Sequence, residues 1–496
     1  MKRAILIRFL IVVGSAAALL TVSGDSDAFR FYHQHLRWRA CEDDGLVKAG
    51  AECADVRVPL DYDRPGGRTM IVAISRIKAV DPAQRRGILM SNPGGPGAEG
   101  LDSEYLLGDV ITPQVRARYD LIGMDPRGVG RSGRAGLCGW PVPEMIRSAG
   151  MDEAGFRREV TVARRMADTC LAGDVTKLRQ LTTRNTARDM DLIRSVLGER
   201  KVSYYGLSYG TYLGAVFAQM FPERSDRIVL DSAIDPDRYW EGLVQNWGPA
   251  DELALDDWAN WVATQDDRYH LGESGPQVRA LVEDLLRHAG QNPIVVDGGV
   301  LDDHLFPFVL HNSLRSFRLN DALAEAVRAI SDAAAATPAP QSTSLLRELL
   351  QALQSGENSA EADIACGDAE APRDPEWYWR NIERTRTAQP VFGALANNIQ
   401  PCAFWPQPVE PPTLVRNAVP ALIVQATGDP RTPYPGAVHL HHNMTGSRLV
   451  TLRDARKHGT FTPGLSNCVN TTINGYLAEG QLPNADVTCY LDQPIG

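Results

Sequence analysis

One short segment places a serine where it could act as a nucleophile. Gly206-Leu207-Ser208-Tyr209-Gly210 matches the pattern Gly-x-Ser-x-Gly, whose small flanking residues let a strand turn sharply into a helix. The apolar run Val202–Tyr205 predicts the strand, and the periodicity of Tyr209–Phe221 predicts the helix. Such a turn would present the Ser208 hydroxyl to a carbonyl carbon, with the helix N-terminus stabilising the developing negative charge. The alternative is an ordinary glycine-rich connection.

A serine hydroxyl is a weak nucleophile, so it needs a histidine base and a carboxylate that orients the base. Asp429 follows the predicted strand Ala421–Ala426, and His458 follows the predicted strand Arg448–Leu452. Both side chains would therefore lie beyond the carboxyl ends of strands. Because serine, acid and histidine occur in the order expected for a nucleophile on a strand-to-helix turn, we predict Ser208, Asp429 and His458 as a catalytic triad.

Other residues could in principle fill these roles. Asp454 is a rival acid, but it follows the strand that leads to the histidine rather than the preceding one. The rival bases are His439, His441 and His442, of which His439 and His442 could share a helical face. A solvated helix end explains these histidines better than a metal site, and no C-x2-C spacing indicates zinc. We therefore predict no metal and no cofactor.

A negative charge on the substrate oxygen needs two backbone N–H donors. Tyr209, directly after the nucleophile, should supply one of them. The other should come from Asn92–Gly97, which follows the predicted strand Gly87–Ser91, with Gly95 or Gly94 allowing close approach to the substrate. A plain turn is the alternative, because structural glycines and prolines would look much the same.

A second glycine-rich segment imitates a dinucleotide-binding motif. Gly128–Gly133 fits G-x-G-x-x-G and follows the predicted strand Tyr119–Met124. A dinucleotide site would require a helix to begin there, whereas residues 135–141 are rich in glycine and end in proline, as in a loop. We therefore predict that the chain binds neither NAD nor FAD.

Strands alternate with helices around these motifs, which predicts an α/β fold with a mostly parallel sheet covered by helices. The pattern between about Asp235 and Pro390 is instead helical with few candidate strands, which indicates a helical insertion. The remaining strands are predicted at Met70–Ile77 and Arg227–Leu230, and the helices at Asn185–Leu197, Glu252–Thr264, Gln277–His288, Asn320–Ala336 and Ser344–Leu353.

Composition and the N-terminus indicate an exported globular protein. The 496 residues are 44% hydrophobic and carry 51 Lys and Arg against 61 Asp and Glu, a charge of −10 that disfavours nucleic-acid binding. Lys2, Arg3 and Arg8 precede an apolar run from about Phe9 to Val22 and then small residues, as in a secretory signal. The alternative, an uncleaved anchor, is disfavoured because the run is short. We expect no stable membrane span after cleavage.

Five motifs in this order resemble the exported tripeptidyl aminopeptidases of the α/β-hydrolase superfamily, relatives of proline iminopeptidase. The likeness runs from about Trp38 to the C-terminus. The motifs are Asn92-Pro93-Gly94-Gly95-Pro96-Gly97, Asp125-Pro126-Arg127-Gly128-Val129-Gly130-Arg131-Ser132, Gly206-Leu207-Ser208-Tyr209-Gly210, Gly428-Asp429-Pro430-Arg431-Thr432-Pro433 and Lys457-His458-Gly459.

The resemblance implies an α/β-hydrolase fold in which Ser208, Asp429 and His458 are the triad and residues 125–132 form a structural turn. It further implies a signal peptide over residues 1–24, a hydrolase core over 29–235 and 391–496, and a helical cap insertion over 236–390. Two positions depart from the family: Glu99 lies near the oxyanion loop, and Lys457 replaces the glycine that often precedes the histidine.

The activity implied is that of a serine aminopeptidase, secreted or held in the periplasm or cell envelope, that releases residues or short peptides from free N-termini. Such an enzyme must bind an ammonium group, for which carboxylates are suited. Glu99, Glu104 and Asp235 are candidates, although each could equally be a surface carboxylate. The alternatives are a carboxylesterase or lipase-like hydrolase with the same triad, and a non-catalytic envelope binding protein.

The eight cysteines fall in near pairs along the chain, and export would allow them to form disulfides. Pairing between sequence neighbours is our hypothesis. It joins Cys41 to Cys53, Cys138 to Cys170, Cys366 to Cys402, and Cys468 to Cys489.

Overall fold

The computed structural model describes residues 23–102, 107–133, 138–142, 144–296, 298–335, 343–355 and 358–493. The predicted signal peptide over residues 1–24 lies almost wholly outside this range, and its last two residues begin helix α1 (Ser23–Tyr32). Glu104 also lies outside the described residues. None of the helices in the described ranges combines the length and the apolar character that a membrane span requires.

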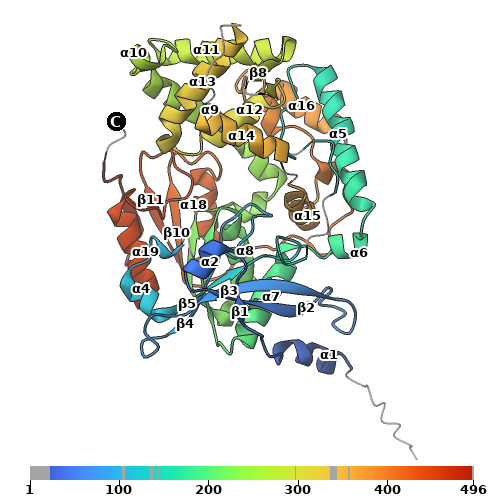
Figure 1. Cartoon of the computed structure of the whole chain (residues 1–496), viewed down its shortest axis with the longest axis vertical. Coiled ribbons are helices and arrows are strands. Elements are labelled where there is room, and N and C mark those ends of the chain that lie inside the picture. The colour runs from blue at the N-terminus through green and yellow to red at the C-terminus, as the bar shows by residue number, and fades with distance from the viewer. Residues whose placement is uncertain are drawn as a thin grey trace, which may run out of the picture.

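A ten-stranded sheet forms the lower part of the molecule in Figure 1, in the order β1-β2-β3-β5-β4-β6-β7-β10-β11-β12. Strands β1, β2, β3 and β5 pair antiparallel, and all later neighbours pair parallel, so the predicted mostly parallel sheet is confirmed. The strands are β1 Arg39–Ala40, β2 Glu52–Pro59, β3 Thr69–Ile77, β4 Gly87–Asn92, β5 Tyr119–Met124, β6 Val202–Leu207, β7 Ser225–Asp231, β10 Ala421–Ala426, β11 Ser447–Leu452 and β12 Val487–Cys489.

Helices cover both faces of this sheet, which is why its central strands are apolar without alternation. In β4, Ile88 and Met90 join one buried cluster while Leu89 joins the cluster of the opposite face. The first face is covered by α7 (Thr183–Val196), α8 (Tyr209–Met220) and α18 (Tyr434–Asn443), and the second by α4 (Pro113–Arg118) and α19 (Asn467–Glu479).

The segment between β7 and β10 lies above the sheet in Figure 1 and has a buried cluster of its own around Trp258. We call residues 236–390 the cap, and its limits stay a prediction. Helix α5 (Glu153–Leu171) packs beside it. The helices that follow β7 are α9 Glu241–Ala263, α10 Asp266–Tyr269, α11 Gly275–Gln291, α12 Phe306–Ser313, α13 Asn320–Ala334, α14 Ser344–Ser355, α15 Ser359–Asp368, α16 Pro375–Thr385 and α17 Gly393–Ala396.

Five strands were not expected from the sequence, namely β1, β2 and β12 of the sheet and two strands within the cap. Strand β2 was not predicted, although its residues are buried in a partly alternating pattern against β3. Within the cap, residues expected to be helical or loop form a hairpin of β8 (Ile294–Val296) and β9 (Gly299–Leu301). Both strands of the hairpin are short, so periodicity in the sequence is too brief to reveal them.

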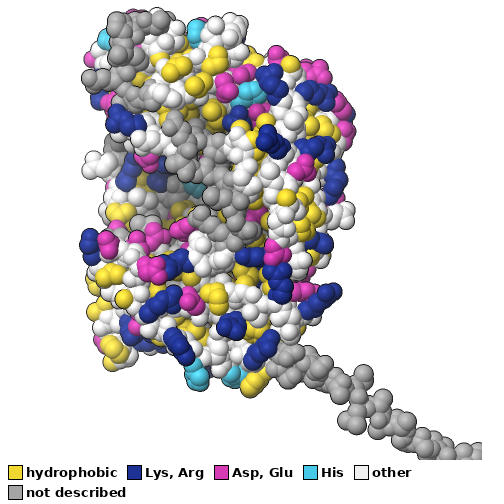
Figure 2. Space-filling model, turned by 45° about the vertical axis from the view of Figure 1, so that its right-hand side comes forward, with side chains coloured by type: hydrophobic (Ala, Val, Ile, Leu, Met, Phe, Trp, Pro, Cys, Tyr) yellow, Lys and Arg dark blue, Asp and Glu magenta, His cyan; other side chains and the backbone are white. Residues whose placement is uncertain are grey.

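The outer surface carries charges of both signs. On the face in Figure 2, Lys and Arg side chains are interspersed with Asp and Glu side chains. Several exposed arginines form ion pairs, such as Arg86 with Asp226 at 2.8 Å and Arg416 with Asp237 at 2.7 Å.

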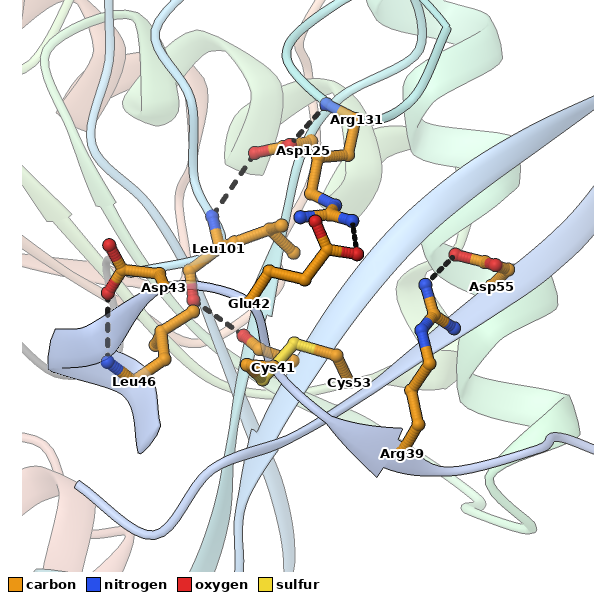
Figure 3. The surroundings of a disulfide bond; sticks show 11 residues. Arg39, Cys41, Glu42, Asp43, Leu46, Cys53, Asp55, Leu101, Asp125 and Arg131 are labelled. Atoms are coloured by element: carbon orange, nitrogen blue, oxygen red, sulfur yellow. Dashed lines mark hydrogen bonds and ion pairs between the residues drawn. A yellow bond between two sulfur atoms is a disulfide. The ribbon is translucent and has the colours of Figure 1, made fainter. Parts of the chain in front are cut away.

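All four cysteine pairs predicted from sequence neighbours are disulfides in the structure. Figure 3 shows the pair Cys41–Cys53, which joins the segment after β1 to β2. The ion pair between Glu42 and Arg131 lies beside it and ties this edge of the sheet to the loop after β5. The four bonds fit a protein that matures in an oxidising compartment.

Candidate active site

Ser208 occupies the tight turn between β6 and α8 with a φ of 58° and a ψ of −122°. The turn brings backbones so close that its flanking glycines have no room for a side chain. A Cβ on Gly206 would lie 2.2 Å from the carbonyl oxygen of Gly210, and a Cβ on Gly210 would lie 2.7 Å from that of Asn92. The Ser208 N–H donates to the carbonyl of Asp231 at 3.0 Å, which fixes the turn to the neighbouring strand.

The structure brings Asp429 and His458 together from two different loops. Nδ1 of His458 lies 2.9 Å from Oδ2 of Asp429 and 3.1 Å from Oδ1. Asp429 also accepts hydrogen bonds from the Thr432 hydroxyl and the Arg431 N–H, both at 2.9 Å. Burial alone would raise the pKa of Asp429, but His458 and these hydrogen bonds outweigh it and hold that pKa below its ordinary value. The carboxylate is thus ionised and oriented toward the imidazole.

The residues that directly follow His458 are bonded to the core at the end of β7. The carboxylate of Asp231, at the end of β7, accepts from the Thr460 N–H at 2.9 Å, the Thr460 hydroxyl at 2.8 Å and the Phe461 N–H at 2.9 Å. The Gly459 N–H donates to the hydroxyl of Ser232 at 2.8 Å. These bonds explain how a loop residue gains the fixed position that a general base needs.

The cap also contacts this loop through the backbone. The His458 N–H donates to the carbonyl of Arg315, and the Phe317 N–H donates to the carbonyl of Arg456, each at 2.8 Å. The guanidinium of Arg456 adds a bond to the Leu314 carbonyl at 2.8 Å. The segment after α12 and the loop of His458 therefore form one unit.

The predicted oxyanion loop lies against Ser208. A Cβ on Gly94 would lie 2.9 Å from the Cβ of Ser208, so only glycine permits this approach, and Gly94 has a φ of 107°. The Gly94 N–H already donates to the Asn92 side chain at 3.1 Å, whereas Gly95 lines the cavity that contains Ser208. The Tyr209 side chain is buried, and its hydroxyl pairs with that of Thr183 at 2.6 Å. Gly95 and Tyr209 stay the predicted donors.

The glycine-rich segment after β5 has a structural role. The carboxylate of Asp125 accepts from the N–H groups of Gly100 at 2.8 Å, Leu101 at 3.2 Å and Arg131 at 2.8 Å, as Figure 3 shows for the last two. Residues 127–133 form turns and no helix begins among them. The segment therefore supports the end of the oxyanion loop and lacks the helix start of a dinucleotide site.

Ser208 and His458 line one cavity of about 360 Å³ between core and cap. Its wall combines apolar, acidic and basic side chains. The lining residues are Pro93, Gly95, Glu144, Ile146, Leu207, Ser208, Ile234, Trp240, Leu243, Trp247, Phe308, His311, Asn312, Arg315, Asn358, Glu361, Arg431, Thr432 and His458.

Two carboxylic acids in this wall were not predicted. Burial raises the pKa of Glu144 to about 7 and, together with Glu144, raises that of Glu361 to about 8. Glu361 lies beside the oxyanion loop, because a Cβ on Gly97 would lie 2.8 Å from the Glu361 nitrogen. Glu144 precedes α5 and Glu361 lies in α15, so no local sequence pattern links them. Their convergence depends on the packing of the cap.

The residues first considered for an ammonium site lie elsewhere. Asp235 pairs with His439, a rival base, at 2.9 Å, and neither residue lines the cavity. Glu99 is likewise outside the cavity wall. Asp454, the rival acid, is exposed, and its N–H donates to the hydroxyl of Thr427 at 2.9 Å.

The cavity contains a second Asp–His pair that sequence reasoning missed. Nδ1 of His311, in α12, lies 2.6 Å from Oδ2 of Asp251, in α9, and both side chains are buried. Burial, with the nearby charges of Arg431 and His458, holds the pKa of His311 well below its ordinary value. His311 is therefore a neutral imidazole that lines the same cavity as His458.

The buried Glu361 should make stability depend on pH. Burial raises the pKa of its carboxyl from the ordinary 4.5 to about 8 in the folded chain, so the unfolded chain binds fewer protons between these pH values. Stability should therefore fall as pH rises through this window, by up to about 1.4 kcal/mol per pH unit from this group. Urea unfolding between about pH 5 and pH 8 would measure the slope, which Glu361→Gln should reduce. Parallel curves for the two proteins would contradict the assignment.

Comparison with known proteins places this geometry in a family. A family model described as alpha/beta hydrolase fold matches residues 88–274, and one described as TAP-like protein matches residues 389–489. A tripeptidyl aminopeptidase of Streptomyces lividans is 34% identical over 481 residues, covering 91% of this chain and 86% of that protein. The chain belongs to the tripeptidyl aminopeptidase family of the α/β-hydrolase superfamily. This family member is a serine hydrolase of the peptidase type.

Two further relatives show how the family varies. The serine protease Hip1 of Mycobacterium tuberculosis is 28% identical and covers 92% of this chain and 91% of its own length. A carboxylesterase B of Mycobacterium tuberculosis is 29% identical and covers 91% and 89%. Relatives with peptidase and esterase names thus resemble this family member over nearly the same length, so the family alone does not decide its substrate.

Proposed function

We propose that the protein is a secreted aminopeptidase that releases short peptides or residues from free N-termini through an acyl-enzyme. The observation that supports this most is the cavity that holds Glu144 and Glu361 together with Ser208. Two carboxyl groups in an enclosed space suit a substrate ammonium, whose charge would draw them into the ionised form. An ester or lipid substrate without an amine would give these groups no cationic partner; Glu361 accepts only a neutral hydrogen bond, from the Asn358 side chain at 2.8 Å.

The proposed mechanism uses the predicted triad. The Ser208 oxygen bonds to the substrate carbonyl carbon while its proton passes to Nε2 of His458, and Asp429 holds the imidazole in the required tautomer. The N–H groups of Tyr209 and Gly95 receive the oxyanion. The C–N bond breaks as His458 protonates the leaving amine, and water then hydrolyses the acyl-enzyme by the same proton transfers in reverse.

Export is the proposed setting of this activity. The N-terminal sequence favours a cleaved signal peptide, and the four disulfides fit an oxidising compartment. The proposed partner is then a peptide with a free N-terminus outside the cytoplasm. Edman sequencing of the protein purified from the culture medium or envelope should begin near residue 25; an intact N-terminus would contradict signal cleavage.

The decisive experiment compares free and acetylated tripeptidyl-aminomethylcoumarins. We expect Glu361→Gln and Glu144→Gln each to lower kcat/KM for the free amine by about 10- to 100-fold, the effect of losing a hydrogen bond between charged groups. Hydrolysis of the acetylated substrate should change little. The control is Glu370→Gln, since Glu370 is exposed just after α15.

Two results would contradict this proposal. The first is a wild type that hydrolyses the acetylated and the free substrate equally well. The second is cleavage of p-nitrophenyl esters without cleavage of any peptide. That outcome would favour the second candidate function, a carboxylesterase, which is supported by the resemblance to the carboxylesterase B relative.

A further inference from the structure

Two arginines stand out in the cavity wall because they meet at one residue without an acidic partner. Nη2 of Arg431 donates to the side-chain oxygen of Asn312 at 2.9 Å, and Nη1 of Arg315 donates to its backbone oxygen at 2.7 Å. Among the described residues, neither arginine forms an ion pair, unlike Arg127, which is paired with Asp189 at 2.6 Å. Asn312 therefore holds two like charges close together.

This arrangement is costly unless an anion is present. Burial and repulsion by Arg315 help to lower the pKa of Arg431 to about 10. Burial also lowers the pKa of Arg315. Asp251, Glu361 and Asp429 attract Arg431, and Glu348 attracts Arg315, all from beyond ion-pair distance. The guanidinium of Arg431 also lies 5.6 Å from the ring of Trp247, which limits its movement. The positions of the two cations are thus set in advance of binding.

The two arginines lie on the side of the cavity where the leaving group must be. The carbonyl of Arg315 accepts from the His458 N–H at 2.8 Å, and the Arg431 N–H donates to Asp429 at 2.9 Å. In the proposed reaction His458 protonates the leaving amine, so the leaving group must lie within hydrogen-bond reach of this histidine. The Glu361 backbone lies beside the oxyanion loop, and its carboxyl is near enough to attract Arg431 without forming an ion pair with it.

We propose that Arg315 and Arg431 bind a carboxylate of the leaving group, so that the enzyme prefers substrates with an anion directly after the scissile bond. The inference rests on the proposed aminopeptidase function. Guanidinium groups bind carboxylates through paired, charge-assisted hydrogen bonds, which suits two arginines fixed at one residue. The carboxylate can come from the C-terminus of a short peptide or from an acidic side chain.

The test uses four peptides that share the N-terminal part Ala-Ala-Ala and differ only in the leaving group. Alanine and alanine amide compare the C-terminal carboxylate with a neutral end, and aspartate amide and asparagine amide do the same for a side chain. We expect at least one anionic leaving group to give a kcat/KM at least about tenfold above its neutral counterpart. Equal values within both pairs would overturn the proposal.

Variants assign this preference to the two arginines. Arg431→Gln and Arg315→Gln should each bring the ratio of anionic to neutral kcat/KM to within about threefold of one, and Arg431→Lys should retain part of it. Arg318→Gln is the matched control, because Arg318 is exposed nearby and donates to the Gly464 carbonyl at 2.7 Å. The proposal would be overturned if Arg431→Gln and Arg315→Gln lowered kcat/KM equally for anionic and neutral peptides and so left the ratio unchanged.

A separate substrate tests the proposed aminopeptidase function independently of the anion site. Ala-Ala-Ala-aminomethylcoumarin has a free amine and a neutral leaving group without a carboxylate. Release of the fluorophore with no preference among the four peptides would refute the anion site alone. Failure to cleave this substrate and all four peptides would refute the aminopeptidase function itself.

Discussion

Replacing Ser208 by alanine is expected to lower kcat on a peptide substrate on the order of 10⁶-fold and to abolish labelling by a fluorophosphonate. The hydroxyl oxygen is the only non-hydrogen atom that the variant removes. Without this oxygen no acyl-enzyme can form. Ser208→Ala adds no atom to the tight turn, so the variant should fold. Its thermal unfolding temperature should stay close to that of the wild type.

The matched control for this prediction is Ser203→Ala. Ser203 lies on the same strand, β6, but its hydroxyl bonds to Asp226 at 3.1 Å, away from the cavity. Labelling and turnover should survive in this variant. Labelling that persists in Ser208→Ala would place the nucleophile elsewhere, and a wild type that is never labelled would favour the non-catalytic binding protein.

Replacing Asp429 by asparagine is expected to lower kcat by about 10⁴-fold while leaving the fold intact. An asparagine can present an N–H toward Nδ1 of His458, which would place the imidazole proton on the nitrogen that must accept from Ser208. The variant also loses the negative charge that stabilises the imidazolium during the reaction. Steady-state kinetics on the tripeptidyl substrate, with circular dichroism as a check on folding, would measure the effect.

The second Asp–His pair in the cavity provides the comparison for this variant. Asp251→Asn disturbs His311 in the same way that Asp429→Asn disturbs His458, but in the cap rather than beside the nucleophile's strand. A loss in Asp251→Asn that is at least as large as that in Asp429→Asn would identify His311 as the base. We expect the Asp429 variant to be the more impaired by two orders of magnitude or more, on the order of the penalty for a wrong tautomer.

The sequence predicts those parts of the site whose structure is determined by residues close together in the chain. The strand, turn and helix around Ser208 are encoded within about twenty residues, because glycine is required wherever the backbones meet. Asp429 and His458 follow strands that pair in parallel, so a shared sheet edge brings their loops together. The disulfides also follow sequence neighbours, with the largest separation being 36 residues.

The remaining cavity residues come from segments that have no common pattern in the sequence. Glu144 precedes α5, Glu361 lies in α15, and Arg315 follows α12. A buried glutamate or arginine looks like a surface residue until the packing of the cap is known, because charged residues are mostly exposed. His311 was missed for the same reason, since it lies within an apolar helix and far along the chain from Asp251.

The loop of His458 is bonded both to the core and, through the backbone of Arg315 and Phe317, to the cap. If the cap lifts to admit a polypeptide, its two backbone hydrogen bonds to this loop must break, so the proposed base loses part of its support until the cap closes again. A bulky folded protein that keeps the cap open would therefore keep the proposed base without this support. Cleavage would then be restricted to thin chain ends that fit inside the closed cavity. Folded proteins near this hydrolase would not be cleaved.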